Sequence, residues 1–186
     1  KMQEEKYHVE AVTFLVQSES LEKLRERFVS AARLIKKAVF ESRPIVVRHN
    51  ADCDGYSGAI ALERAIVPLV LEHHKDNYSQ WKYYRRAPSK APFYAYGDAV
   101  LDVVTLTNEM AKNGMREPLV IIVDNGSGVE DVLGIKQVRM YGCPVIIIDH
   151  HFFAQDMISS IVFLSTITAF ALLICSIFIF SKSSSE

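Results

Sequence analysis

Three short aliphatic runs, each followed directly by polar residues, most constrain the fold of this 186-residue chain. They are "IVVRH" (Ile45–His49), "LVIIV" before Asp124, and "VIII" before Asp149. Their hydrophobic residues are continuous and do not alternate with polar ones, which is typical of strands covered on both faces. Such strands belong to parallel sheets with helices on either side. The runs therefore predict an α/β fold with a doubly wound, mainly parallel, Rossmann-like sheet.

Helical patterns lie between these runs. The segment Glu19–Ser42 carries hydrophobic residues at three- and four-residue steps with Lys, Arg and Glu between them, which predicts an amphipathic helix. Further helices are predicted from Tyr56 to at least Pro68, from Asp98 to Gly114, and through "VEDVLGIKQVRMYG". The stretch "DNYSQWKYYRRAPSKAPFYAYG" has no regular pattern and is predicted to be irregular.

Side chains that can bind metal ions follow all three predicted strands. They are His49, Asp52, Asp54, Asp124, Asp149, His150 and His151. Because ligands of doubly wound folds bind beyond the carboxyl ends of the strands, these side chains should meet in one crevice. Aspartates so close together repel one another unless cations neutralise them. Carboxylate and imidazole ligands suit Mn²⁺ or Mg²⁺, and two such ions could activate water and stabilise phosphate oxygens.

Each motif by itself also has an ordinary structural explanation. Asp52 and Asp54 could cap the following helix, Asp124 could be a turn residue in "DNGSG", and His150 with His151 could be a surface pair. Capping does not explain why all three strands end in this way. The coincidence favours a metal site.

The motifs "HNADCDG", "VDNGS" and "IIIDHH", in this order, resemble the first three motifs of the DHH phosphoesterase superfamily. The longer stretch "IVVRHNADCDGYSGAIALERAI" is most similar to the archaeal RecJ-like single-strand-specific exonucleases. The resemblance extends over roughly Ile45 to Phe153. It implies a metal-dependent phosphoesterase, a hydrolase acting on ester bonds.

The resemblance also implies roles for individual residues. The residues expected at the metal ions are His49, Asp52, Asp54, Asp124, Asp149 and His150. Asp52 and Asp54 would each hold one ion of a pair, and Asp124 would bridge both. His150 would bind the second ion, and His151 would contact the substrate phosphate. The expected catalytic residues are Asp124, His150 and His151.

Asp149 has a further role in this scheme, since it would orient the two histidines that follow it. The family also has a fourth motif, an aspartate well beyond "DHH", and a C-terminal substrate-binding domain. Here Asp156 is the only aspartate after His151 and is too close for that role. The sequence therefore divides into an N-terminal segment with its helix (1–43), an apparently truncated DHH domain (44–156) and a hydrophobic tail (157–186).

The tail contains 23 consecutive uncharged residues, Ile158–Phe180. A bilayer is crossed by about 20 apolar residues, so this segment could be a membrane-anchoring helix. It could also be non-native sequence that follows a truncation, or a buried element of the same domain. The charged start "KMQEEKYHVE" is unlike a signal peptide, and three scattered cysteines suit a reducing compartment, so a cytoplasmic protein is expected.

The stretch "QWKYYRRAPSK" interleaves aromatic and basic side chains. Trp81 could stack on bases while Arg85 and Arg86 contact phosphates, as in proteins that bind single strands. The alternative is an edge strand with a solvated basic face. On the first interpretation, Arg85 and Arg86 join His151 as substrate-binding residues.

Together these features predict a Mn²⁺- or Mg²⁺-dependent phosphodiesterase or exonuclease acting on single-stranded DNA, RNA or short oligonucleotides. One alternative is a cyclic-dinucleotide phosphodiesterase or pyrophosphatase. Another is a catalytically impaired scaffold that binds replication or repair proteins, which the missing fourth motif favours. The net charge of −1 decides between none of these, because only the distribution of charge matters for nucleic-acid binding.

Overall fold

The computed structural model describes residues 14 and 17–151, except for the side chains of residues 20 and 106–113. Asp156 and the segment Ile158–Phe180 lie outside the described residues. Among the helices of the described part, none is long and apolar enough to cross a membrane.

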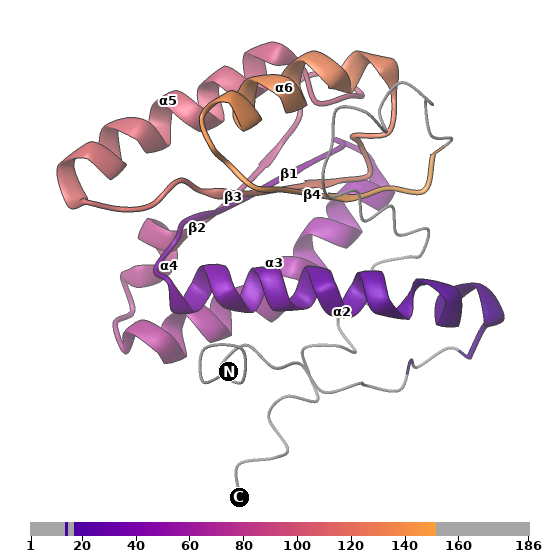
Figure 1. Cartoon of the computed structure of the whole chain (residues 1–186), viewed down its shortest axis with the longest axis horizontal. Helices are drawn as coiled ribbons and strands as arrows, with labels where there is room; N and C mark the ends of the chain where they lie inside the picture. The colour runs from indigo at the N-terminus through magenta and orange to yellow at the C-terminus, as the bar shows by residue number, and fades with distance from the viewer. Residues whose placement is uncertain (1–13, 15–16, 152–186) are drawn as a thin grey trace, which may run out of the picture.

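Four parallel strands form the sheet, three of which were predicted from the sequence. They are β1 (Ile45–His49), β2 (Tyr84–Pro88), β3 (Leu119–Val123) and β4 (Val145–Ile148), in the order β2-β1-β3-β4. On one face of the sheet lie α2 (Glu19–Phe40), α3 (Cys53–His74) and α4 (Ser79–Tyr83). The other face is covered by α5 (Tyr96–Asn113) and by α6 (Val132–Met140), which follows a short 3-10 turn at Val129–Asp131 (Figure 1). The predicted doubly wound α/β fold is therefore confirmed.

The central strand β3 explains why its sequence is aliphatic at every position. Leu119, Ile121 and Val123 pack into the core on the α2 and α3 side. Val120 and Ile122 pack into the separate core against α5 and α6. Because both faces are covered, no position of β3 tolerates a polar residue without loss. Each fully buried side chain of this size contributes about 1.5–3 kcal/mol.

Strand β2 lies within the stretch predicted to be irregular, so that prediction was wrong for residues 79–88. The edge strand that the sequence predicted as an alternative is confirmed, with Arg85 exposed and Arg86 partly buried on it. β2 pairs only with β1 among the described strands, which leaves its other edge open. Pro88 suits such an edge because it has no N–H to donate. Pairing with β1, and not a hydrophobic pattern, makes this segment a strand.

A buried ion-pair network fastens α5 to the sheet. Arg48 of β1 donates from Nε to Oδ2 of Asp102 at 3.2 Å, and from Nη2 to the other carboxylate oxygen. Its Nη1 donates to the carbonyl of Pro88 at 2.9 Å and lies 3.5 Å from Oδ1 of Asp98. The hydroxyl of Tyr94 also donates to Asp102, at 3.1 Å. Arg48, Asp98 and Asp102 are all buried, so each charge depends on the others for compensation.

Candidate metal centre

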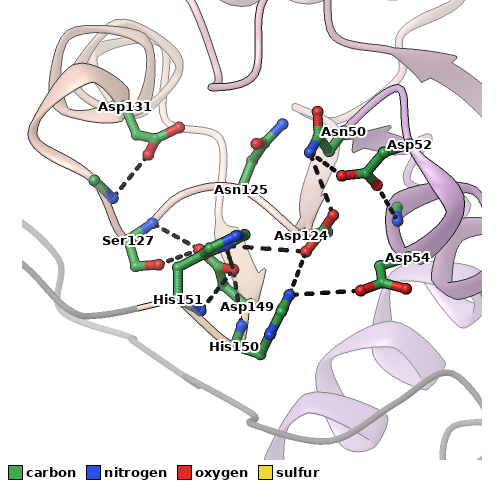
Figure 2. A network of polar contacts seen from close by, with 12 residues as sticks. Asn50, Asp52, Asp54, Asp124, Asn125, Ser127, Asp131, Asp149, His150 and His151 are labelled. Atoms are coloured by element: carbon green, nitrogen blue, oxygen red, sulfur yellow. Dashed lines mark hydrogen bonds and ion pairs between the residues drawn. The ribbon is translucent and has the colours of Figure 1, made fainter.

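The carboxyl ends of β1, β3 and β4 bring together a cluster of carboxylates and imidazoles around Asp124 (Figure 2). Nε2 of His150 lies 2.9 Å from Oδ1 of Asp124 and 3.9 Å from Oδ2 of Asp54. Nδ1 of His151 lies 3.9 Å from the same oxygen of Asp124. Asp124 is buried, whereas both histidines and Asp54 are about half exposed. The cluster therefore has a buried floor and a rim open to solvent.

Asp124 has a left-handed backbone conformation, with φ at 56°. Its amide donates to the carbonyl of Ile148 at 2.8 Å, so the turn begins as soon as the ladder with β4 ends. Among residues other than glycine, Asp and Asn enter this region most readily. The strained turn brings the carboxylate close to the polar residues that follow the other strands. Backbone strain of this kind is common at functional sites.

Asp52 has the capping role that its position after β1 suggested, and it also lies in the cluster. Its Oδ1 accepts a hydrogen bond from the amide of Gly55 at 3.0 Å, which caps the N-terminus of α3. Its Oδ2 accepts from Nδ2 of Asn50 at 2.6 Å. The same amide nitrogen lies 3.4 Å from Oδ2 of Asp124 and so connects the two carboxylates.

The turn into α3 requires a glycine at position 55. A Cβ there would lie 2.8 Å from the carbonyl carbon and 2.9 Å from the nitrogen of Asn50, and closer still to its oxygen. We expect Gly55→Ala to lower the free energy of unfolding by about 1–3 kcal/mol, because backbone atoms cannot move aside cheaply. Urea denaturation monitored by circular dichroism measures the change.

Gly97 provides the matched control, since a Cβ at that helical position meets no atom within 4 Å. Gly97→Ala should leave stability unchanged or raise it by up to about 1 kcal/mol. Equal effects of the two substitutions would show that the turn at Gly55 does not depend on its close approach to Asn50.

Asp149 is buried and fully engaged by hydrogen bonds. Its Oδ2 accepts from the amide of Ser127 at 3.1 Å and also from the hydroxyl of that residue. Its Oδ1 accepts from the amides of His150 and His151, at 2.8 and 3.2 Å. Nδ1 of His151 completes the set at 2.7 Å. These contacts leave Asp149 in the orienting role and not in direct contact with the open part of the cluster.

His49 lies apart from the group around Asp124. Its Nδ1 is 2.6 Å from the carbonyl oxygen of Asn50, which can only accept, so this nitrogen carries the proton. Its Nε2 faces Nη1 of Arg86 at 3.5 Å, and its ring packs edge-on against Tyr56, with 4.6 Å between centroids. Burial, together with Arg86 and Arg48, lowers the pKa of His49 and keeps it neutral. His49 is thus engaged by Asn50, Arg86 and Tyr56, and its predicted role at the metal ions stays a prediction.

Residues 44–173 match the model of the DHH family, N-terminal domain. The chain belongs to the DHH family. The superfamily comprises phosphoesterases, and its members generally depend on divalent metal ions. The chain is therefore related to metal-dependent hydrolases. This agrees with the superfamily predicted from the three motifs.

Two relatives place the domain in a longer context. The uncharacterized protein MJ1198 of Methanocaldococcus jannaschii is 46% identical over 141 residues, which cover 76% of this chain and 18% of the relative. The solved DHH domain of PF0399, a protein described as a member of a family of ribosomal proteins, is similar in structure with a TM-score of 0.84 and 33% identity. That match covers 95% of this chain and 44% of the solved one. The chain thus spans about a fifth of the curated relative.

The electrostatics of this DHH domain centre on Asp124. Burial, followed by the adjacent carboxyl of Asp52, raises the pKa of Asp124 to about 6. The hydrogen bond from Gly55 lowers the pKa of Asp52, so as the pH falls Asp124 takes up a proton before Asp52 does. For His151, the hydrogen bond to Asp149 raises the pKa and favours the imidazolium form.

The residues present suit a divalent cation. Oδ1 of Asp124 is buried and accepts no hydrogen bond among the described residues, because Nε2 of His150 is close but not aligned for donation. One ligand atom from each of Asp124, His150 and His151 lies within 4.8 Å of the others. A buried carboxylate oxygen that faces imidazole nitrogens and further carboxylates has the ligand chemistry that divalent cations bind. Asp52 and Asp54 stand beside this group, on the first turn of α3.

Several supporting residues escaped prediction from the sequence. Asn50 connects Asp52 to Asp124, and Ser127 holds Asp149. The carboxylate of Asp131 accepts from the amides of Tyr94 and Gly128, at 2.6 and 2.8 Å, and thereby shapes the loop after β3. The only available signal was their position inside or just after the motifs, and side chains of these types are common in turns for purely local reasons.

The raised pKa of Asp124 predicts a pH-dependent affinity for metal ions. Below about pH 6 the carboxyl holds a proton that a cation must displace. We therefore expect the affinity for Mn²⁺ to fall by up to about tenfold per pH unit below this value, and to depend much less on pH above it. Isothermal titration calorimetry between pH 5 and 8, in buffers of different ionisation enthalpy, measures both affinity and proton release. An affinity that is constant over this range would contradict the prediction.

Proposed function

We propose that this DHH domain hydrolyses phosphodiester bonds in single-stranded nucleic acid or short oligonucleotides, in the manner of the RecJ-like exonucleases and with Mn²⁺ or Mg²⁺. The proposal rests on one observation. Residues that follow three strands meet around Oδ1 of Asp124, a buried oxygen that accepts no hydrogen bond among the described residues. Carboxylates from two strand ends and imidazoles from the third supply the ligand chemistry such ions require.

Asp52, Asp54, Asp124 and His150 would hold the metal ions. When bound, divalent ions lower the pKa of a coordinated water and offset the charge of phosphate oxygens. The protein contributes a rigid, partly buried carboxylate framework. Asn50 keeps Asp52 and Asp124 together, and the cap at Gly55 fixes Asp52 on the first turn of α3.

His151 has the properties needed to bind a substrate phosphate. Its Nδ1 donates to Asp149, and that contact raises the pKa of the ring, so the imidazolium form persists closer to neutral pH. The side chain is 55% exposed, so its other nitrogen can donate to a phosphate oxygen at the open rim. A charge-assisted hydrogen bond of this kind is about twice as strong as a neutral one.

The substrate class is inferred from the basic residues near the site and from one relative. Arg86 lies beside His49, whose ring packs against Tyr56 in the first turn of α3, and Arg85 precedes Arg86 on the edge strand. The solved relative is named as a ribosomal-protein family member, which supports RNA as the first polymer to test. Pyrophosphate and cyclic dinucleotides are the small-molecule alternatives.

A cleavage assay tests the proposal. End-labelled single-stranded RNA and DNA, a cyclic dinucleotide and pyrophosphate are each incubated with the protein in Mn²⁺, in Mg²⁺ and in EDTA. We expect metal-dependent shortening of a single strand by the wild type and by Asp76→Asn, an exposed aspartate in the α3–α4 connection, but not by Asp124→Asn.

Each other outcome has a defined meaning. Cleavage confined to pyrophosphate or a cyclic dinucleotide would replace the polymer with a small substrate. Metal binding in calorimetry without cleavage of any substrate would contradict the hydrolase and favour a scaffold for replication or repair proteins.

A further inference from the structure

The open edge of β2 borders a groove of about 800 Å³, here called the β2-edge groove. Its walls come from α3, α4 and β2, with a contribution from α5. The polar and aromatic residues that matter below are Glu63, Arg64, Trp81, Lys82, Arg85 and Arg86. The groove is separate from the cluster around Asp124, which lies at the carboxyl ends of the strands.

The groove carries a local excess of three positive charges, from four cations and one carboxylate. Arg86 donates to Glu63 at 2.7 Å, which neutralises that carboxylate. Among the described residues, no carboxylate lies within ion-pair distance of Arg64, Lys82 or Arg85. The chain as a whole has a net charge of −1, so the excess of three positive charges in the groove is a local feature that suits a polyanion.

Trp81 gives the groove a flat apolar surface. It lies on the short helix α4 and is 80% exposed. An indole left in water leaves a large apolar area unburied, whereas tryptophan is highly buried on average. Proteins that bind single-stranded nucleic acid combine exposed aromatic rings, on which bases stack, with cations that follow the phosphates. Trp81 and its neighbour Lys82 present this combination side by side.

Two side-chain contacts lead from the groove to the first turn of α3, which Asp52 caps. Nη1 of Arg86 lies 3.5 Å from Nε2 of the buried His49. The His49 ring packs against Tyr56, which is 40% exposed in the first turn of α3. Asp52 caps that same turn. A strand lying along β2 would therefore approach the rim on which Asp54 and His150 stand.

We propose that the β2-edge groove binds the phosphate backbone of a single-stranded polynucleotide, stacks a base on Trp81, and directs the strand toward Asp124. The inference that the strand is directed toward Asp124 rests on the proposed hydrolase function. Binding of the strand in the groove requires neither metal nor cleavage. The competing occupant is a protein strand added to the β2 edge. Pro88, which has no N–H to donate, and the uncompensated cations disfavour it.

Trp81 is the one tryptophan of the chain, so tryptophan fluorescence reports directly on binding in the groove. Asp124→Asn protein is titrated with single-stranded oligouridylate of about 15 nucleotides, the upper range of single-strand site sizes, in EDTA so that the strand cannot be cleaved. We expect saturable quenching of the tryptophan fluorescence. The logarithm of the binding constant should fall with the logarithm of salt concentration with a slope of about −2, from about −0.7 per phosphate contact.

Matched substitutions identify the surface. Lys82→Ala and Arg85→Ala should each reduce the magnitude of that slope by about 0.7, whereas Lys136→Ala, exposed on α6 across the sheet, should not. With a labelled oligonucleotide followed by anisotropy, Trp81→Ala should bind about fivefold more weakly or worse, and Trp81→Phe should retain most of the affinity. Circular dichroism of each variant shows that it is folded.

The outcomes separate this proposal from the hydrolase. Groove-dependent binding without cleavage by the wild type would support the groove and contradict the hydrolase. Cleavage by the wild type, with binding unchanged in the Lys82, Arg85 and Trp81 variants, would overturn the groove alone. Absence of oligonucleotide binding together with self-association that these substitutions abolish would also overturn it, in favour of a protein partner.

Discussion

Asp124→Asn should weaken Mn²⁺ binding by about 100-fold or more while making the metal-free protein more stable. The carboxylate is the buried centre of the site, and its Oδ1 has no hydrogen-bond donor among the described residues. An amide at this position removes the charge that attracts the ion and also the penalty of burying that charge. Asparagine keeps the left-handed conformation at φ 56°, whereas alanine would add backbone strain. Calorimetry and urea denaturation measure the two effects.

The sign of the stability change follows from the pKa. Asp124 has its pKa raised to about 6, so the folded state binds a proton more tightly than the unfolded state does. That contribution to stability is fully present below the unfolded value of about 4, and it is lost as the pH rises through about 6. Asp124→Asn should therefore gain roughly 1–3 kcal/mol at pH 8 and little at pH 4.5. A loss of stability at pH 8, or undiminished Mn²⁺ binding, would refute the assignment of Asp124 as the centre of the site.

Arg48→Met should destabilise the fold by about 3–5 kcal/mol at neutral pH. The substitution leaves Asp102 and Asp98 buried without their cation, and burial already raises the pKa of Asp102 despite the hydrogen bonds from Arg48. Because an unpaired Asp102 can escape the penalty by protonation, the loss should become smaller as the pH falls. Urea denaturation at pH 5 and pH 7.5 measures both the magnitude and the trend.

Two variants test this explanation. Arg85→Met removes the same side chain from an exposed position on the neighbouring strand and should change stability by less than about 0.5 kcal/mol. In the double variant Arg48→Met/Asp102→Asn, much of the lost stability should return, because the buried charge is removed as well. If the double variant is as unstable as the sum of the two single variants, the network is not held together by its charges.

The elements of the fold that could be predicted are those whose cause is local. β1, β3 and β4 each bury both faces, so their sequences are aliphatic without interruption and identify themselves as strands of a parallel sheet. α2 was recognisable from its alternation of apolar and charged residues. β2 was predicted only as one of two alternatives, because its sequence "YRRAP" is polar and its strand conformation depends on pairing with β1, which lies well before it in the chain.

In the candidate site too, some features have a local cause in the sequence and others depend on tertiary packing. That carboxylates and imidazoles would follow the strands was visible in the sequence, because a polar residue directly after an aliphatic run marks the strand end. Which of them meet was not visible. His49 ends β1 and was expected with the others, but in the structure its ring donates to the carbonyl of Asn50 and packs on Tyr56, contacts that the sequence did not reveal.

The sequence by itself determined β1, β3 and β4, their parallel arrangement and the motifs at their ends, because hydrophobic continuity and turn chemistry act between near neighbours in the chain. The tertiary structure decided what those motifs become. It paired Arg48 with Asp102, 54 residues apart, left Oδ1 of Asp124 without a donor beside His150, and placed Trp81 and Arg85 along one open edge. These contacts depend on the packing of helices against both faces of the sheet, which no local pattern in the sequence encodes.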